Sequence, residues 1–171
     1  MQEFISNPYL IDGHAFDFGV YILITSIDPL RVYKWSDEIL FRFCSEPYYP
    51  FDSKIIEKYV TQNHKPYWEI PSLAEHTKSY NFSAKEALNF CLKQDSRDVK
   101  AFWSQMDIAI STIILAKSTQ IARHVDLFRK SHPDLKRGFF ELVRFDFIVD
   151  NEMNLHLMEV WILEHRITEF L

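Results

Sequence analysis

Residues 138–163 read GFFELVRFDFIVDNEMNLHLMEVWIL, and this stretch decides the fold. The runs 138–149 and 155–163 are rich in Phe, Val, Ile and Leu, and the polar segment DNEMN between them is a turn signal. We therefore predict two strands joined in an antiparallel hairpin. Asp146 and Glu159 are carboxylates set into these otherwise apolar strands.

Asp146 and Glu159 are the first candidates for chemistry. Facing each other across a hairpin, they can share a hard cation. Magnesium takes oxygen ligands and usually bridges protein carboxylates to substrate phosphates, so the pair suits nucleotide chemistry. The alternative is that each is a solvent-facing residue of an amphipathic strand, because strands alternate faces. The pattern alone leaves both interpretations open.

Upstream of the hairpin, the pattern becomes helical. Residues 83–86 (Ser-Ala-Lys-Glu) form a capping box, which predicts a helix that runs to about Lys93. From Asp98 to about Arg129, apolar residues recur at helical spacing and predict one long amphipathic helix that ends before Pro133. The members of this apolar face include Phe102, Met106, Ile110, Ile113, Ile114, Ile121, Val125 and Phe128.

The N-terminal part favours strands again. Residues 16–25, 30–35 and 39–44 are rich in aromatic and β-branched residues and are separated by short polar breaks, which predicts a meander of three strands. Residues 46–79 contain four prolines and many aromatics, and we predict a long irregular loop packed onto the body. The order of strands, loop, helices and hairpin indicates an α+β fold.

Composition excludes several classes of protein. The 171 residues, 47% hydrophobic and 16% aromatic, predict one globular domain or a large part of one, with a substantial sheet. A net charge of -5 without a basic cluster argues against nucleic acid. Cys44 and Cys91 lack the spacing of a zinc site or disulfide framework. The stretch 108–116 is shorter than a membrane span of about 20 residues, and the N-terminus is unlike a signal peptide, so we predict a cytoplasmic protein without a membrane anchor.

Several motifs, in order along the chain, resemble the tubulin-tyrosine-ligase-like family. Residues 140–146 and 157–160 resemble the end of its ATP-grasp domain, where members read Phe-Glu-Leu, a small residue, Phe-Asp, and then Leu-Leu-Glu-Val-Asn. The opening resembles the same family from its adenine-binding hinge onward. The matching segments there are residues 2–5, 7–8, 10–13, 16–17, 28–33 and 42–48.

The resemblance implies an ATP-grasp-like mixed or antiparallel sheet with one long helix, in an incomplete domain. Residues 1–160 would be the C-terminal part of that domain, and residues 161–171 a divergent tail. It also implies an ATP-dependent ligase, closest to the polyglutamylases, that activates a tubulin carboxylate as an acyl phosphate for attack by an amino acid, glutamate above all. The expected cofactors are ATP and Mg²⁺, and the expected location is the microtubule cytoskeleton.

The resemblance also assigns roles to individual residues. Magnesium would be held by Asp146 and Glu159, and the incoming amino acid's carboxylate by Arg42. The adenine and nucleotide contacts would come from Gln2, Glu3, Phe4, Ile5, Asp17 and Thr61. Simpler structural explanations stand beside these roles: Phe4 and Ile5 as strand core, Asp17 as a strand-end cap, Thr61 as a loop residue, and Arg42 as a surface residue opposite Glu38.

The chain also departs from the family pattern. His14-Ala15 stands where members usually carry Arg-Lys, Gly19 where they carry Arg, Gln62 where they carry Asn, and Trp161 where they carry the Asn that is the third metal ligand. We therefore expect this chain to be inactive on its own. The rival interpretation is a pseudoenzyme or a tubulin-binding module. A metal-dependent hydrolase is disfavoured, because no ligand spacing links His14, His64, His76, His124, His132, His156 and His165.

Overall fold

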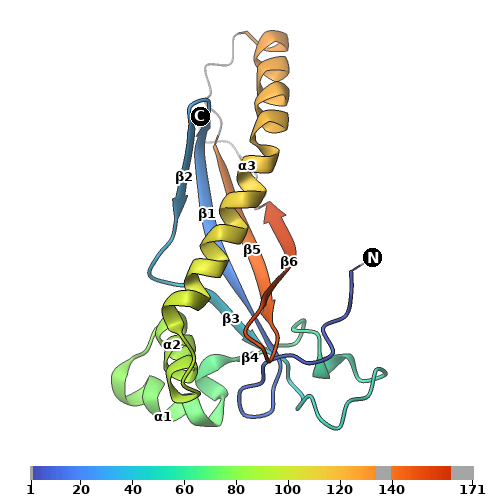
Figure 1. The fold of residues 1–171 in the computed structure, drawn as a ribbon, viewed down its shortest axis with the longest axis vertical. Coiled ribbons are helices and arrows are strands. Elements are labelled where there is room, and N and C mark those ends of the chain that lie inside the picture. The colour runs from blue at the N-terminus through green and yellow to red at the C-terminus, as the bar shows by residue number, and fades with distance from the viewer. Residues whose placement is uncertain (1, 134–139, 163–171) are drawn as a thin grey trace, which may run out of the picture.

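The long strand β1 (Phe16–Ile27) is the centre of the sheet in the computed structural model, which describes residues 2–133 and 140–162 (Figure 1). All the strand pairs within these residues are antiparallel. With the long helix α3 (Val99–Ser131), this sheet confirms the predicted α+β class. The strand order is β4 (Lys65–Pro66), β3 (Leu40–Phe43), β1, β5 (Glu141–Val149) and β6 (Leu155–Ile162).

The predicted C-terminal hairpin is confirmed as β5 and β6. Its turn is closed by a hydrogen bond of 3.1 Å from the Asp150 amide to the Asn154 carbonyl. Asp146 and Glu159 are register partners across the hairpin, and a β-bulge follows directly between Asp146 and Phe147. The ends of the predicted strands at residues 138, 139 and 163 lie outside the described residues.

The three predicted N-terminal strands are confirmed, but the predicted meander is wrong. Strand β2 (Leu30–Lys34) pairs with residues 22–27 of β1, and β3 pairs with residues 16–19 of the same strand. Because β5 occupies the other edge of β1, β2 and β3 follow one another along a single edge. The 12 residues of β1 are long enough to pair with both short strands. The connection through residues 35–39 bulges out between them.

The predicted irregular loop over residues 46–79 is correct only in part. Two short 3₁₀ turns, Ile56–Lys58 and Tyr67–Glu69, lie within it, and helix α1 (Pro71–Tyr80) occupies its end. Pro71 was counted as evidence for a loop, but it stands in the first turn of α1, where an amide donor is not needed. The helix ends at Asn81, which adopts the left-handed conformation with φ 51°.

Helices α2 (Ala84–Gln94) and α3 pack on one face of the sheet and enclose the core. The predicted capping box of α2 is confirmed in Ser83 and Glu86. At the start of α3, Asp98 accepts a hydrogen bond from the Ala101 amide. The side chains of β1 and β5 that point to this face alternate with those that do not. The buried members include Phe16, Phe18, Val20 and Ile22 of β1, and Val143, Phe145, Phe147 and Val149 of β5.

The fully buried residues of α3 lie in its first half, and Ile121 and Val125 further along are only partly buried against the core. Phe102, Met106, Ile110 and Ile114 are buried against the sheet, whereas Phe128 is 53% exposed. Figure 1 shows the helix running obliquely across the sheet and projecting past its end. By length and composition alone, α3 passes the test for a membrane-crossing helix, a test that core helices of soluble proteins also pass.

Candidate functional site

The face of the sheet opposite helices α2 and α3 carries charged side chains. The face that the helices cover carries aromatic side chains. On β1, Asp17 and Gly19 alternate with the buried Phe16 and Phe18, so they point away from the helices. Register brings charged neighbours to the same face, since Asp17 pairs with Arg42 of β3 and Gly19 pairs with Asp146 of β5. Three strands therefore contribute to one polar surface.

Asp17 and Arg42 form a buried, two-pronged ion pair. The Nε and Nη2 atoms of Arg42 donate to Oδ1 and Oδ2 of Asp17 over 2.8 and 2.7 Å. Thr61 adds a hydrogen bond of 2.6 Å from Oγ1 to Oδ2 of the same carboxylate. Burial raises the pKa of Asp17, and the hydrogen bonds from Arg42 and Thr61 oppose this rise without cancelling it. The structure thus brings together three residues that the resemblance assigned to the site.

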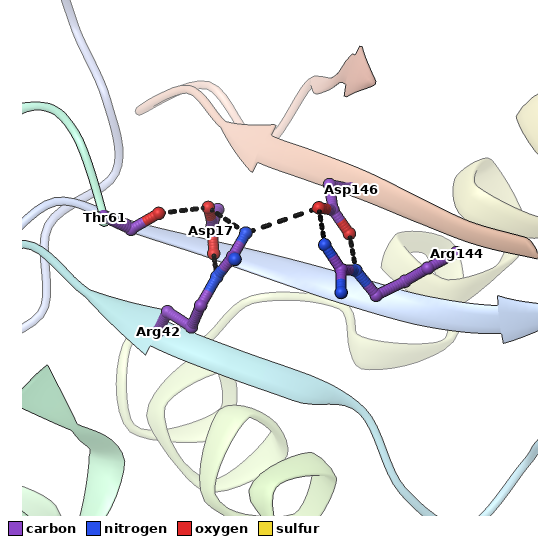
Figure 2. A network of polar contacts seen from close by, with 5 residues as sticks. All are labelled: Asp17, Arg42, Thr61, Arg144 and Asp146. Carbon is purple, nitrogen blue, oxygen red and sulfur yellow. Dashed lines mark hydrogen bonds and ion pairs between the residues drawn. The ribbon is translucent and has the colours of Figure 1, made fainter. Parts of the chain in front are cut away.

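Asp146 is fully buried and is held mainly by Arg144. The Nε and Nη2 atoms of Arg144 donate to its two carboxylate oxygens over 2.6 and 2.7 Å, and Arg42 adds a longer contact of 3.3 Å. Figure 2 shows the resulting row of charges across the sheet, from Thr61 through Asp17, Arg42 and Asp146 to Arg144. Arg144 has no role in the family resemblance, although its position two residues before Asp146 on a strand places it on the same face.

Glu159 completes the predicted carboxylate pair from the edge strand. It is exposed and lines one cavity with Asp17 and Arg42. Within residues 2–133 and 140–162, no group of three or more His, Cys, Asp and Glu side chains is placed to hold a metal ion. A magnesium ion is commonly held by one or two carboxylates together with substrate phosphates, and Asp146 and Glu159 are oxygen donors of that kind. In this structure both oxygens of Asp146 already accept hydrogen bonds from Arg144, whereas Glu159 is exposed at the cavity.

Two adjoining cavities connect the charged row to the N-terminal segment. One, of about 360 Å³, is lined by Asp17, Arg42, Thr61 and Glu159 among others. The other, of about 580 Å³, is lined by residues 2–7 together with parts of β5 and β6. Ile148 and Met158 line both cavities. All the predicted site residues except the fully buried Asp146 therefore line this pair of cavities.

The N-terminal segment is held along β6 without joining the sheet as a strand. Gln2 donates from Nε2 to the Met158 carbonyl over 2.6 Å. Phe4 is 50% exposed and contacts the rings of Phe51 and Tyr59. The explanation of Phe4 and Ile5 as strand core is therefore wrong, since both lie outside regular strands and line the larger cavity.

Two other simple explanations are also wrong. Arg42 does not lie opposite Glu38: its partners are Asp17 and Asp146, while Glu38 accepts hydrogen bonds from the amides of Ile39 and Ala84. Asp146 is not solvent-facing, because its side chain is 0% exposed. Glu159 is exposed, as the amphipathic-strand interpretation expected.

The departures noted in the sequence lie at the site itself. Ala15 lines the smaller cavity and brings no cation to it. His14 is buried and its Nδ1 lies 2.8 Å from the Cys44 carbonyl, so it belongs to the packing around that loop. Gly19 lies beneath Asp146 and Arg144. Of these three positions, Ala15 is the one that lines the smaller cavity, so its lack of charge bears on a ligand there.

Another carboxylate, Asp150, organises the turn that joins β5 to β6. It accepts hydrogen bonds from the amides of Glu152 and Asn154 and from the Asn154 side chain, each at 2.9 Å, and it pairs with His156 at 3.0 Å. Burial alone would raise the pKa of Asp150, but the hydrogen bonds from His156, Asn154 and Glu152 outweigh it and lower the pKa to about 2. The ionised form therefore stabilises the hairpin.

This lowered pKa predicts a specific loss of stability in acid. The contribution of Asp150 is complete above its unfolded-state pKa of about 3.9 and is lost as the pH falls toward 2. Asp150→Asn is expected to lower stability at pH 7 by about 1–3 kcal/mol and to flatten the acid limb of the stability curve. Urea unfolding between pH 2 and 7 measures both effects. Asp126→Asn, on an exposed turn of α3, is the control. If stability fell as steeply in acid for Asp150→Asn as for the wild type, the lowered pKa of Asp150 would not be the cause of the acid loss.

Comparisons with known proteins agree over nearly the whole chain. The model of the tubulin-tyrosine ligase family matches residues 1–163. A probable tubulin polyglutamylase of Caenorhabditis elegans, ttll-15, is 37% identical over 160 residues, which cover 93% of this chain and 30% of that protein. Tubulin polyglutamylase TTLL13 of Mus musculus is 32% identical, over 93% of this chain and 20% of its own length. Tubulin polyglutamylase TTLL7 of Xenopus tropicalis is 26% identical, over 94% and 18%. The chain therefore spans less than a third of each of these relatives.

Proposed function

This chain belongs to the tubulin-tyrosine ligase family, and we propose that its two adjoining cavities form part of the ATP and magnesium site of a tubulin–amino acid ligase. The observation that supports this proposal is the lining of the two adjoining cavities. Predicted site residues that are far apart in the sequence, from Gln2 to Glu159, lie together there, beside the buried Asp146. The proposed architecture is the later part of an ATP-grasp domain over residues 1–160, with a divergent segment from residue 161.

In this proposal, the larger cavity receives the adenine and the smaller one the phosphates. Gln2, Glu3, Phe4 and Ile5 border the larger cavity, where backbone groups can hydrogen-bond the base and Ile148 offers an apolar wall. Asp17 and Thr61 lie at the smaller cavity, beside Arg42. Asp146 and Glu159 would hold magnesium, which neutralises phosphate charge during phosphoryl transfer.

Arg42 is proposed to bind the carboxylate of the incoming amino acid. Its Nε and Nη2 atoms are engaged by Asp17 and Asp146, and within the described residues its Nη1 makes no hydrogen bond. A guanidinium fixed in this way can donate further hydrogen bonds to a carboxylate without losing its own position. Asp17 thus holds Arg42 ready for that contact.

The proposed reaction is amide formation in two steps. A carboxylate oxygen of tubulin attacks the γ-phosphorus of ATP and ADP leaves, which gives an acyl phosphate. The amine of an amino acid then attacks the acyl carbon and phosphate leaves. Glutamate is the proposed amino acid because the relatives are named polyglutamylases, and the proposed location is the microtubule cytoskeleton of the cytoplasm.

We propose that the chain by itself does not complete this reaction. Ala15 and Gly19 supply no cation, and Trp161 stands where the resemblance expects a third metal ligand. Transfer of labelled glutamate to tubulin by the purified chain would contradict this. The alternative function is a pseudoenzyme or tubulin-binding module, which the same substitutions favour.

Nucleotide binding separates the two functions. The purified chain is expected to bind ATP saturably in calorimetry with magnesium, and to lose at least about 10-fold in affinity when EDTA removes the ion. A folded chain that binds tubulin but shows no heat with ATP would support the binding module instead.

A further inference from the structure

Gly19 and Arg144 share one small space on the charged face. A Cβ atom on Gly19 would lie 2.6 Å from Oδ1 of Asp146 and 2.8 Å from Cδ of Arg144. Real Cβ atoms do not approach other atoms so closely, so the Arg144 side chain lies across β1 only because position 19 has no side chain. Register places the two positions diagonally, since Gly19 pairs with Asp146 and Tyr21 pairs with Arg144.

Position 19 lacks an arginine that the family pattern has, and position 144 has an arginine that the family pattern lacks. Arg144 stands where the pattern has a small residue directly before Phe-Asp. Both positions lie on the same face of the sheet. A guanidinium is therefore present at this spot, but it comes from β5 and not from β1.

Trp161 belongs to the same group of substitutions. It is the register partner of Arg144 on β6, and its ring centroid lies 5.9 Å from Cζ of Arg144, within cation–π range. Gly19 thus opens the space on one side of Arg144, and Trp161 contacts it from the neighbouring strand. Three departures from the family pattern meet at a single side chain.

We propose that Arg144 replaces the missing arginine of position 19 and is the positioning residue that orients Asp146 in the nucleotide site. Within the described residues, Arg144 donates two hydrogen bonds to Asp146, at 2.6 and 2.7 Å, and Arg42 donates one at 3.3 Å. Its side chain is 14% exposed, and its guanidinium is directed at this carboxylate. A guanidinium is thereby kept next to Asp146, but Arg144 is not among the described residues that line the two cavities. The role of Arg144 toward a nucleotide rests on the proposed function, whereas its exchange with position 19 does not.

An exchange experiment tests this directly. Arg144→Gly leaves the buried Asp146 with only its long contact to Arg42, and Gly19→Arg forces a side chain into occupied space. Each single variant is expected to lower Tm by about 5 °C or more, and the double variant Gly19→Arg/Arg144→Gly to recover most of the loss. Gly19→Arg/Arg31→Gly is the control, because Arg31 is exposed on β2 and pairs with Ser26, so it should give no recovery.

A second experiment measures how ATP binding depends on the magnesium concentration. A purely structural role of Arg144 would leave this dependence unchanged. Arg144→Lys keeps the positive charge but loses the pair of hydrogen bonds to Asp146. It is expected to raise the magnesium concentration for half-maximal ATP binding by about 10-fold. It is expected to lower Tm less than Arg144→Gly does. Additive Tm losses in the double variant would overturn the exchange, and an unchanged magnesium requirement in Arg144→Lys would overturn the positioning role. Recovery of Tm in a chain whose wild type binds no ATP would support the exchange and contradict the proposed function.

Discussion

Replacing Phe18 with alanine is expected to lower the free energy of unfolding by about 3–5 kcal/mol. Phe18 is 0% exposed, and its ring lies 5.5 Å from Phe102 and from Phe147 and 5.8 Å from Trp103, measured between centroids. It therefore joins the central strand to the long helix and to the C-terminal hairpin. Its loss leaves a cavity where these elements meet. Urea unfolding followed by circular dichroism measures the change.

Phe128→Ala is the matched control for Phe18→Ala. Phe128 lies on the part of α3 that projects past the sheet and is 53% exposed, so its truncation is expected to cost less than about 1 kcal/mol. Equal losses in the two variants would contradict the placement of the core beneath the first half of α3.

Replacing Asp17 with alanine is expected to destabilise the chain by about 3 kcal/mol, because a buried guanidinium then loses its main partner. The side chains of Asp17 and Arg42 are 4% and 18% exposed, so little water reaches the pair. Asp146 still contacts Arg42 at 3.3 Å, which places the expected loss at the lower end of the range for buried pairs. Unfolding in urea at pH 7 measures it.

The exposed pair of Lys34 and Asp107 offers the comparison for Asp17. These side chains are 34% and 51% exposed, and Asp107→Ala is expected to cost less than about 1 kcal/mol. If Asp17→Ala were no more costly than Asp107→Ala, the charged row would be a surface feature and not a buried framework for the site.

The elements with strong local signals were predictable from the sequence. The Ser83 capping box marks the start of α2, the apolar spacing marks α3, and the polar turn before Leu155 marks the hairpin. The errors arose where local signals mislead. Pro71 indicated a loop although proline suits a first helical turn, and consecutive short strands indicated a meander although one long strand pairs with both.

The candidate site was predictable in its membership but not in its contacts. A period of two and a central turn place Asp146 and Glu159 opposite each other, and the structure confirms that register. The family resemblance set Arg42, Asp17 and Thr61 near them. The role of Arg144 could not be predicted from the sequence. It depends on the side chain fitting over Gly19, and these two residues are more than a hundred positions apart in the chain. The catalytic and binding roles of all these residues remain predictions.

The measurement that most directly tests the central claim is calorimetric titration of ATP into the folded chain, with and without magnesium, for the wild type, Asp146→Ala and Asp107→Ala. Near-ultraviolet circular dichroism first establishes that each variant is folded. The account predicts magnesium-dependent binding by the wild type and Asp107→Ala, and a loss of about 10-fold or more in affinity for Asp146→Ala. Equal ATP affinity in the wild type and folded Asp146→Ala, or no binding by either, would contradict it.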